Sequence, residues 1–277
     1  MAIKNMLVHL DNSGTCAQRV EAAVDLARRY GARLSGLFVV PDYFIPSYVE
    51  AQISADIIAE INEQAIERAK LTLEEISSQV EKTGYGIDMQ IEEGNMIGIL
   101  GEYARYTDLL VLGQSQPQDP DNVSAELADH VVIEGGAPCL VIPYIGVQPT
   151  LGKRVLVAWN ESREAARALR DALPLLVEAD QVTVLLVKHH SHNEDHTAMQ
   201  EKTMLAYLAD HGIVAETSLC VDDHGDPGNA ILARASDGDI DLIVMGAYGH
   251  SRLRELVLGG ATRHLLKEMT VPVFISH

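Results

Sequence analysis

The chain has 277 residues, of which 47% are hydrophobic and 5% aromatic, and its formal net charge is −19. This composition excludes a disordered chain, and the acidic charge disfavours nucleic acids and anionic membranes as partners. No segment has the roughly 18–20 apolar residues of a membrane helix, and the first residues lack the apolar run of a signal peptide. The three scattered cysteines indicate neither a disulfide framework nor a zinc site, so we expect a soluble cytoplasmic protein.

Four segments of the first half recur, in the same order, in the second half. The pairs are 4–13 with 153–162, 33–40 with 181–188, 107–114 with 240–247, and 137–143 with 271–277. The last pair closes each half at a similar point, and a stretch that contains Gly and Pro follows the first copy. The sequence therefore predicts two tandem domains, residues 1–146 and 152–277.

Short apolar runs alternate with amphipathic segments along both halves. The expected strands lie near 5–10, 33–40, 86–92, 108–113, 138–143, 154–159, 181–187, 213–221, 241–246 and 271–276. Nearly continuous apolar strands that alternate with helices are typical of parallel sheets covered on both faces. We therefore predict an α/β fold with two tandem doubly wound domains, each with a five-stranded parallel sheet and flanking helices.

The segments between the strands carry helix signals. Residues 16–31 place Val20, Ala23, Val24 and Ala27 on one face and end on Gly31, a plausible helix C-cap. A long helix is expected over about 55–82. Pro174 should end or kink the helix expected over 164–179, and Asp226–Pro227 is typical of a helix start.

A glycine-rich loop, GAYGHSRLRELVLGGAT, covers residues 246–262 of the second half. Gly246 ends a predicted strand, Gly249 follows it, and Gly259 and Gly260 precede a helix expected over about 261–268. Ligands of doubly wound sheets bind beyond the carboxyl ends of the strands, where glycine allows close approach of the backbone. The N–H groups of Gly260, Ala261 and Thr262 would then face a phosphate, assisted by the helix dipole.

This loop is neither a Walker motif nor a dinucleotide fingerprint, because it lacks GK[ST] and does not follow the first strand. Arg252 and Arg254 are the nearby cations, and no lysine is placed to reach a γ-phosphate. The alternative interpretation is one turn glycine together with a pair of glycines that allow helix packing.

With these motifs, both halves resemble the universal stress protein family in its tandem form. The resemblance rests on the strand order, on VLVAWNES, DLIVMGAYGHS and VPVFIS, and on the family pattern G-x2-G-x9-G followed by Ser or Thr. Gly246, Gly249 and Gly259 fit the pattern, whereas Gly260 stands where a hydroxyl residue is expected. The resemblance also implies nucleotide-contacting positions outside this loop, at Ala158, Asn160 and Val187.

In the resemblance, all three of those positions bear on the nucleoside. Ala158 and Val187 would line the adenine pocket, and Asn160 stands where the family's ATP-binding members have an Asp. Backbone N–H groups from Gly249 to His250 and from Gly260 to Thr262 would hold the phosphates.

The first half departs from the family pattern in another way. Asp11 keeps the acidic position, but Gln116 replaces the second glycine and no glycine precedes the next helix. That helix opens with Glu126 and Asp129, whose charges repel phosphate. We expect the first half to be degenerate and unable to bind nucleotide.

The sequence contains other clusters of polar residues that are candidate sites. The histidines of residues 189–196 could hold Zn²⁺ or Ni²⁺, but compositional tracts of histidine are weak evidence, and we expect no metal uptake. His224 with Asp226 could suggest acid/base chemistry, but a helix N-cap explains Asp226 better. Cys139 and Cys220 lie on or beside predicted strands, which favours inert packing.

The resemblance implies a stress-response protein that binds ATP or a related adenine nucleotide in its second domain. ATP would bring its own Mg²⁺, and hydrolysis would be slow at most, since no general base stands beside the loop. Two alternatives remain open: a scaffold for dimerisation and partner binding, and an enzyme on a related adenine-binding fold.

The resemblance also implies assembly through the last strand of each domain. Residues 138–143 and 271–276 should therefore pair within the chain as an intramolecular pseudo-dimer, and further homodimerisation is left open. We expect two five-stranded sheets that remain separate.

Overall fold

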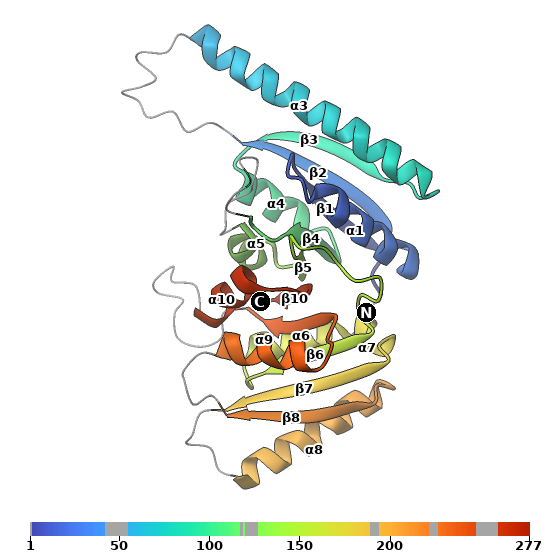
Figure 1. Ribbon diagram of the computed structural model, residues 1–277, viewed down its shortest axis with the longest axis vertical. Helices are drawn as coiled ribbons and strands as arrows, with labels where there is room; N and C mark the ends of the chain where they lie inside the picture. Colours follow the sequence, from blue (N-terminus) through green and yellow to red (C-terminus); the bar gives the residue numbers. More distant parts are fainter. Residues whose placement is uncertain are drawn as a thin grey trace.

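The computed structural model describes residues 2–41, 55–116, 119, 127–188, 194–221, 227–247 and 260–277, and its helices and strands alternate along the chain (Figure 1). The strands are β1 Asn5–Leu10, β2 Arg33–Pro41, β3 Asp88–Gly94, β4 Leu109–Gly113, β5 Cys139–Ile142, β6 Arg154–Trp159, β7 Gln181–Lys188, β8 Ala215–Val221, β9 Leu242–Gly246 and β10 Val273–Ser276. The helices are α1 Cys16–Tyr30, α3 Ala55–Lys82, α4 Met96–Ala104, α5 Leu127–Gly135, α6 Arg163–Asp171, α7 Leu173–Val177, α8 Glu194–Asp210, α9 Pro227–Asp237 and α10 Gly260–Glu268.

All ten strands belong to one sheet, in the order β3-β2-β1-β4-β5-β10-β9-β6-β7-β8. Each half contributes five parallel strands, as predicted, and the expected pairing of the last strands is confirmed: β5 and β10 are antiparallel, with Leu140 opposite Phe274. The expectation of two separate sheets was wrong. Pairing the two edge strands satisfies the backbone N–H and C=O groups of both, so the sheets become one ladder.

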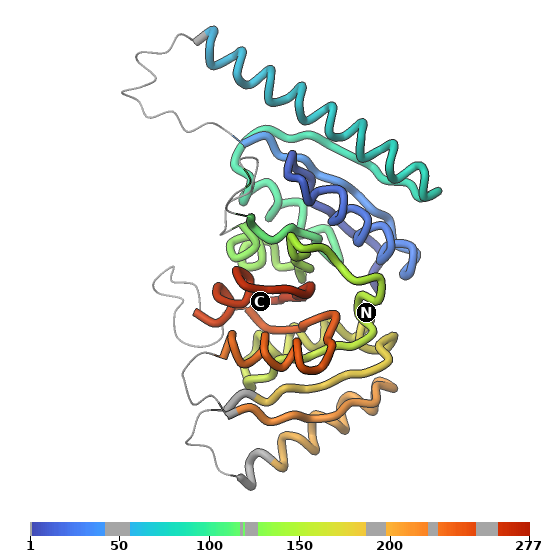
Figure 2. The backbone as a smooth tube through the Cα atoms, viewed as in Figure 1, coloured from blue at the N-terminus to red at the C-terminus, as the bar shows by residue number. Residues whose placement is uncertain are grey.

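Helices cover both faces of this sheet in layers that run through both halves. On one face, α1, α3, α6, α7 and α8 pack over a single hydrophobic cluster that includes Val24, Ile76, Leu169 and Leu208. On the other face, α4, α5, α9 and α10 pack over a second cluster. The tube in Figure 2 shows the first half, in blue and green, stacked on the second half, in yellow and red. The core is therefore continuous across the boundary between the halves.

The amino ends of the central strands are held by an aspartate that recurs in both halves. Asp108 Oδ2 accepts hydrogen bonds from the backbone N–H groups of Lys4 and Asn5, at 2.8 and 2.9 Å. Asp241 accepts from three backbone N–H groups, those of residues 152–154, at 3.0 to 3.1 Å. These bonds fix the strands at the edge of the sheet opposite the expected ligand site.

The local helix signals are confirmed. Gly31 caps α1 with φ 59°, and its backbone N–H donates to the last turn of the helix. The helix expected over 164–179 is broken: α6 ends at Asp171, and the short α7 follows with Pro174 in its first turn. A proline ring clashes with the carbonyl of the residue four positions earlier, so a continuous helix is excluded there. α9 begins at Pro227, as the sequence predicted.

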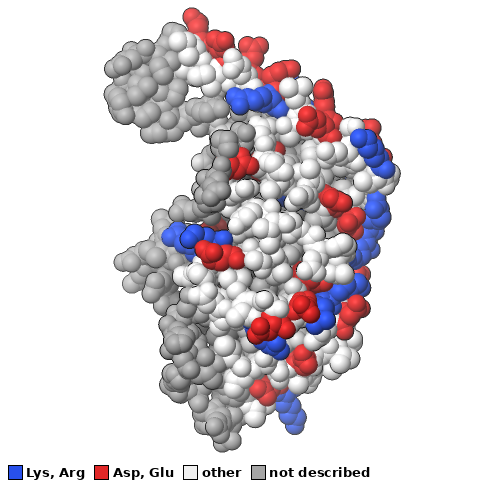
Figure 3. Space-filling model, viewed as in Figure 1, with Lys and Arg blue, Asp and Glu red and all other residues white. Residues whose placement is uncertain are grey.

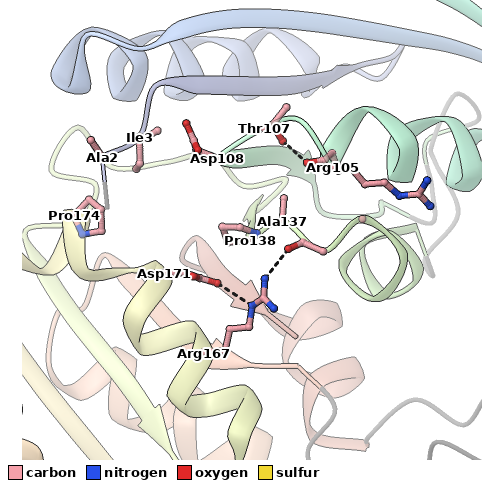
Figure 4. A pocket seen from close by; sticks show the side chains of 13 residues that line it. Ala2, Ile3, Arg105, Thr107, Asp108, Ala137, Pro138, Arg167, Asp171 and Pro174 are labelled. Atoms are coloured by element: carbon pink, nitrogen blue, oxygen red, sulfur yellow. Dashed lines mark hydrogen bonds and ion pairs between the residues drawn. The ribbon is translucent and has the colours of Figure 1, made fainter.

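A cavity of about 290 Å³ lies where the two halves meet, beside the amino ends of the strands (Figure 4). Arg167 of α6 reaches across this junction and donates to the carbonyl oxygen of Gly136 at 2.9 Å, and its Nε lies 3.4 Å from Asp171 Oδ2. Asp171 also accepts from Ser276 Oγ at 2.7 Å. Arg167 and Asp171 therefore tie α6 to the segment that precedes β5 and to the end of β10.

Acidic side chains are spread over the surface and form a row over α3 in the space-filling view (Figure 3). No helix of the described residues is long and apolar enough to cross a membrane.

Candidate functional site

Asn160 and Gly246 lie at the switch point of the second half. β6 pairs with β7 on one side and with β9 on the other, so the chain leaves β6 in one direction and returns on its opposite side. Asn160 directly follows β6, Gly246 ends β9, and Ala158 is opposite Met245 in the pairing of these strands. Ligands of doubly wound sheets bind at this point. The structure thus brings Ala158, Asn160 and Gly246 together at the carboxyl ends of β6 and β9.

Gly246 is packed tightly against the start of α6. A Cβ atom at this position would lie 2.3 Å from the backbone N of Ala165 and 2.4 Å from the carbonyl carbon of Glu164. The first turn of α6 is fixed there by Ser162, whose Oγ accepts a hydrogen bond from the N–H of Ala165 at 3.0 Å. The need for glycine at position 246 is therefore explained by helix packing.

The start of α10 is open. Gly260 is exposed and is the first residue of this helix, and a Cβ atom built on it meets no atom of the described residues within 4 Å. The first turn of α10 contains no acidic residue. Ala261 is half-buried, and Thr262 is only 4% exposed, so its side chain packs toward the core. Free N–H groups at a helix start, without a nearby carboxylate, favour an anion.

Several predicted site residues cannot be placed. Gly249, His250 and Gly259 lie outside the described residues, as do residues 189–193 of the histidine-rich loop and the His224–Asp226 pair. Val187 lies in β7, where its backbone pairs with Cys220. Within the described ranges, no group of three His, Cys, Asp or Glu side chains could hold a metal ion.

The corresponding edge of the first half is filled by a buried ion pair. Arg19 of α1 places its Nη2 atom 2.9 Å from Asp11 Oδ1, and its Nε donates to the carbonyl oxygen of His9 at 2.8 Å. Ser13 donates to the same carboxylate oxygen from its hydroxyl, at 2.5 Å, and from its backbone N–H, at 3.0 Å. The carboxylate of Asp11 is thus already engaged by Arg19 and Ser13.

Arg19 also fills the space beside Gly113, which ends β4 and corresponds to Gly246 of the second half. A Cβ atom on Gly113 would lie 2.1 Å from Arg19 Nη1. Burial alone would raise the pKa of Asp11, but the guanidinium of Arg19, with His9 and Ser13, outweighs burial and lowers this pKa. The carboxylate therefore stays ionised in its pair with Arg19.

His9 lies beside this ion pair and is fully buried. Neither of its ring nitrogens has a hydrogen-bond partner among the described residues, and Nδ1 is 3.7 Å from Asp11 Oδ2. Burial lowers the pKa of His9 to about 4; Asp11 opposes this shift and Arg19 adds to it. His9 is therefore neutral at physiological pH.

Arg19 was not predicted from the sequence, although the sequence carries a signal for it. Arg19 lies four residues before Ala23 and eight before Ala27, so it shares the apolar face of α1. A cation on a buried helix face requires an anionic partner, and Asp11 at the end of the neighbouring strand supplies it. The second half has Ala168 at the equivalent position, where no such pair can form.

The first turn of α5 differs from that of α10 in charge. Asp129 lies in this turn and is 1% exposed. Gln114, which follows β4, is also buried, and its Nε2 donates to the carbonyl oxygens of Leu266 and Lys267 at the end of α10. The first half has thus used its strand ends for contacts within the protein.

The comparisons agree with this architecture. The universal stress protein family matches residues 2–143 and 152–277, so the chain belongs to that family and carries two of its domains in tandem. The universal stress protein Slr1230 of Synechocystis is 23% identical over 98% of this chain and 99% of its own length.

A solved structure that matches nearly the whole chain shows the same fold. A universal stress protein from Archaeoglobus fulgidus superposes with a TM-score of 0.76 at 21% identity, covering 98% of this chain and 97% of its own. A further universal stress protein from Archaeoglobus fulgidus, in complex with dAMP, covers 51% of this chain and 98% of its own at 17% identity, with a TM-score of 0.36.

Proposed function

We propose that this universal stress protein binds ATP or a related adenine nucleotide at one site, in its second half. The observation that carries the proposal is the contrast between the two halves at the carboxyl ends of their strands. In the second half, Asn160 is exposed and α10 starts at an open glycine; in the first half, Arg19 occupies Asp11. An uncharged, open helix start supports binding of phosphate.

In this proposal, Asn160 hydrogen-bonds the ribose, and Ala158 with the backbone of Val187 contacts the adenine. Gly249 and His250, together with Gly260, Ala261 and Thr262, hold the phosphates through backbone N–H groups, and the Thr262 side chain stays packed in the core. Gly246 and Gly259 allow the loop to meet the sheet and the helix closely. ATP would arrive with its own Mg²⁺.

Gly260 offers the sharpest test, because a Cβ atom there meets no atom within 4 Å in the part of the chain that the structure describes, and the fold should be unaffected. Gly260→Asp should weaken ATP binding by roughly fivefold or more, since a carboxylate at the helix start repels phosphate. Gly260→Ser should strengthen binding by about 0.5–1.5 kcal/mol through a hydroxyl contact. Both are measured by calorimetric titration.

Two further variants localise the site. Gly249→Val should abolish binding by blocking the approach of the phosphates, and Gln116→Ala, in the first half, should leave affinity unchanged. Equal affinity in all variants, or no binding of millimolar ATP to the wild type, would instead support the scaffold function.

A further inference from the structure

A second cavity lies in the second half, between α6 and α8. Its volume is about 420 Å³, within the range of small-molecule sites. Apolar and aromatic side chains make up most of its lining, and one arginine lies among them: Trp159, Leu169, Arg170, Met199, Met204 and Tyr207. Met199 is 72% exposed, so a large apolar side chain stands in solvent at the rim.

This cavity is separate from the proposed nucleotide site. Trp159 packs with the hydrophobic cluster under α6 and α8, whereas its neighbour Ala158 packs with the cluster on the opposite face of the sheet. Successive side chains of a strand point to opposite faces, so β6 itself separates the two sites. Binding in the cavity does not depend on nucleotide.

The first half shows that the fold does not require this opening. There, Thr72 of α3 donates from Oγ1 to Asn12 Oδ1 at 2.8 Å, which ties α3 to the start of α1. Leu10, the counterpart of Trp159, is fully buried, and Ile66 and Leu73 of α3 pack against the same core. The equivalent groove is therefore closed by contacts that the second half lacks.

The charges of the cavity define the chemistry of its ligand. Arg170 lies in the last turn of α6 and is exposed, and no carboxylate of the described residues lies within ion-pair distance of it. Glu161 lies at the other end of the cavity, before α6. Its φ of 64° is a conformation that is unfavourable for a residue other than glycine. An anion is therefore attracted at the Arg170 end and repelled at the Glu161 end.

We propose that the cavity between α6 and α8 binds an amphipathic carboxylate, with its acid group at Arg170 and its apolar body against Trp159, Met204 and Tyr207. The apolar body contributes most of the affinity through burial, and the arginine selects the anion and fixes its orientation.

The chain supplies its own reporter, because Trp159 is the single tryptophan. Octanoate and 4-phenylbutyrate, titrated separately, should each change its fluorescence saturably, and the acid with the lower Kd shows whether an aliphatic or an aromatic body fits better. 1-Octanol, which has the same chain as octanoate without the charge, should bind more weakly. Arg170→Gln should weaken octanoate binding by roughly two- to fivefold, as expected for an exposed ion pair, and leave 1-octanol binding unchanged.

Two controls keep the test specific. Glu21→Gln changes the charge at the equivalent position of α1 and should have no effect on either ligand. Ala166→Leu, at a half-buried position that lines the cavity, should reduce binding of both ligands by filling the space. The proposal is overturned if neither acid gives a saturable signal, or if Arg170→Gln affects octanoate and 1-octanol equally.

Discussion

The two halves share one fold but differ in what lies at the carboxyl ends of their strands. The first half closes this edge with Arg19 and Asp11, and closes the groove between its outer helices with Thr72 and Asn12. In the described residues of the second half, neither place is closed by such a pair. The comparison teaches that one copy of a duplicated domain can become structural support while the other keeps space for ligands.

The largest expected effect comes from breaking the buried pair of the first half. Arg19→Met should lower the free energy of unfolding by about 3–5 kcal/mol, because it leaves the Asp11 charge buried without a partner. Urea denaturation measures the loss. Combining it with Asp11→Asn should recover more than half, whereas Asn160→Ala, at the equivalent edge of the second half, should stay within about 0.5 kcal/mol. A small effect of Arg19→Met would contradict the structural role.

The free energy of unfolding should depend on pH through His9, a residue of the first half. Its pKa is lowered from 6.5 to about 4 in the folded protein, so the unfolded chain binds the proton more tightly. Stability from this group is full above pH 6.5 and falls as the pH drops toward 4, by a total of about 3 kcal/mol. His9→Leu should remove this part of the pH dependence, while His211→Gln, at an exposed histidine, should retain it. Identical pH profiles for His9→Leu and wild type would refute the assignment.

Gly246 and Gly260 of the second half should respond to substitution in opposite directions. Gly246→Ala should destabilise by about 1–3 kcal/mol, because the added Cβ meets the backbone of α6. Gly260→Ala should be neutral or stabilising by up to about 1 kcal/mol, because it enters open space at a helix start. Thermal unfolding of both variants checks the contrast, and a large loss from Gly260→Ala would show that the start of α10 is closed.

The smallest effect is expected at the closed groove of the first half. Thr72→Val removes the hydrogen bond to Asn12 and should cost about 0.5–1.5 kcal/mol. Hydrogen exchange should then be faster in α3. If octanoate also began to bind the first half, the closing role of this bond would be confirmed, whereas unchanged exchange would argue against it.

Local patterns predicted most of the fold. Each expected strand lies within two residues of its observed start, and Gly31 and Pro174 act as predicted, because these features depend on neighbours in sequence. The pairing of the last two strands was predicted, but its consequence, that the ladder of β5 and β10 joins the two five-stranded sheets into one, was missed. At the site, Asn160 and Gly246 were brought together as the strand order implied. The packing of α6 on Gly246 and the Arg19–Asp11 pair were missed, since both depend on side-chain geometry between elements.

The joint between β5 and β10 has a consequence for synthesis. β5 ends at Ile142 and β10 begins at Val273, so these two paired strands are separated in the sequence by most of the second half. At a translation rate of 5–20 residues per second, roughly 7–26 seconds pass between the synthesis of these two strands. During that interval the first half exposes an unpaired strand edge, which is prone to pair with another chain. A nascent chain of this protein is therefore most in need of chaperone protection while its second half is being made.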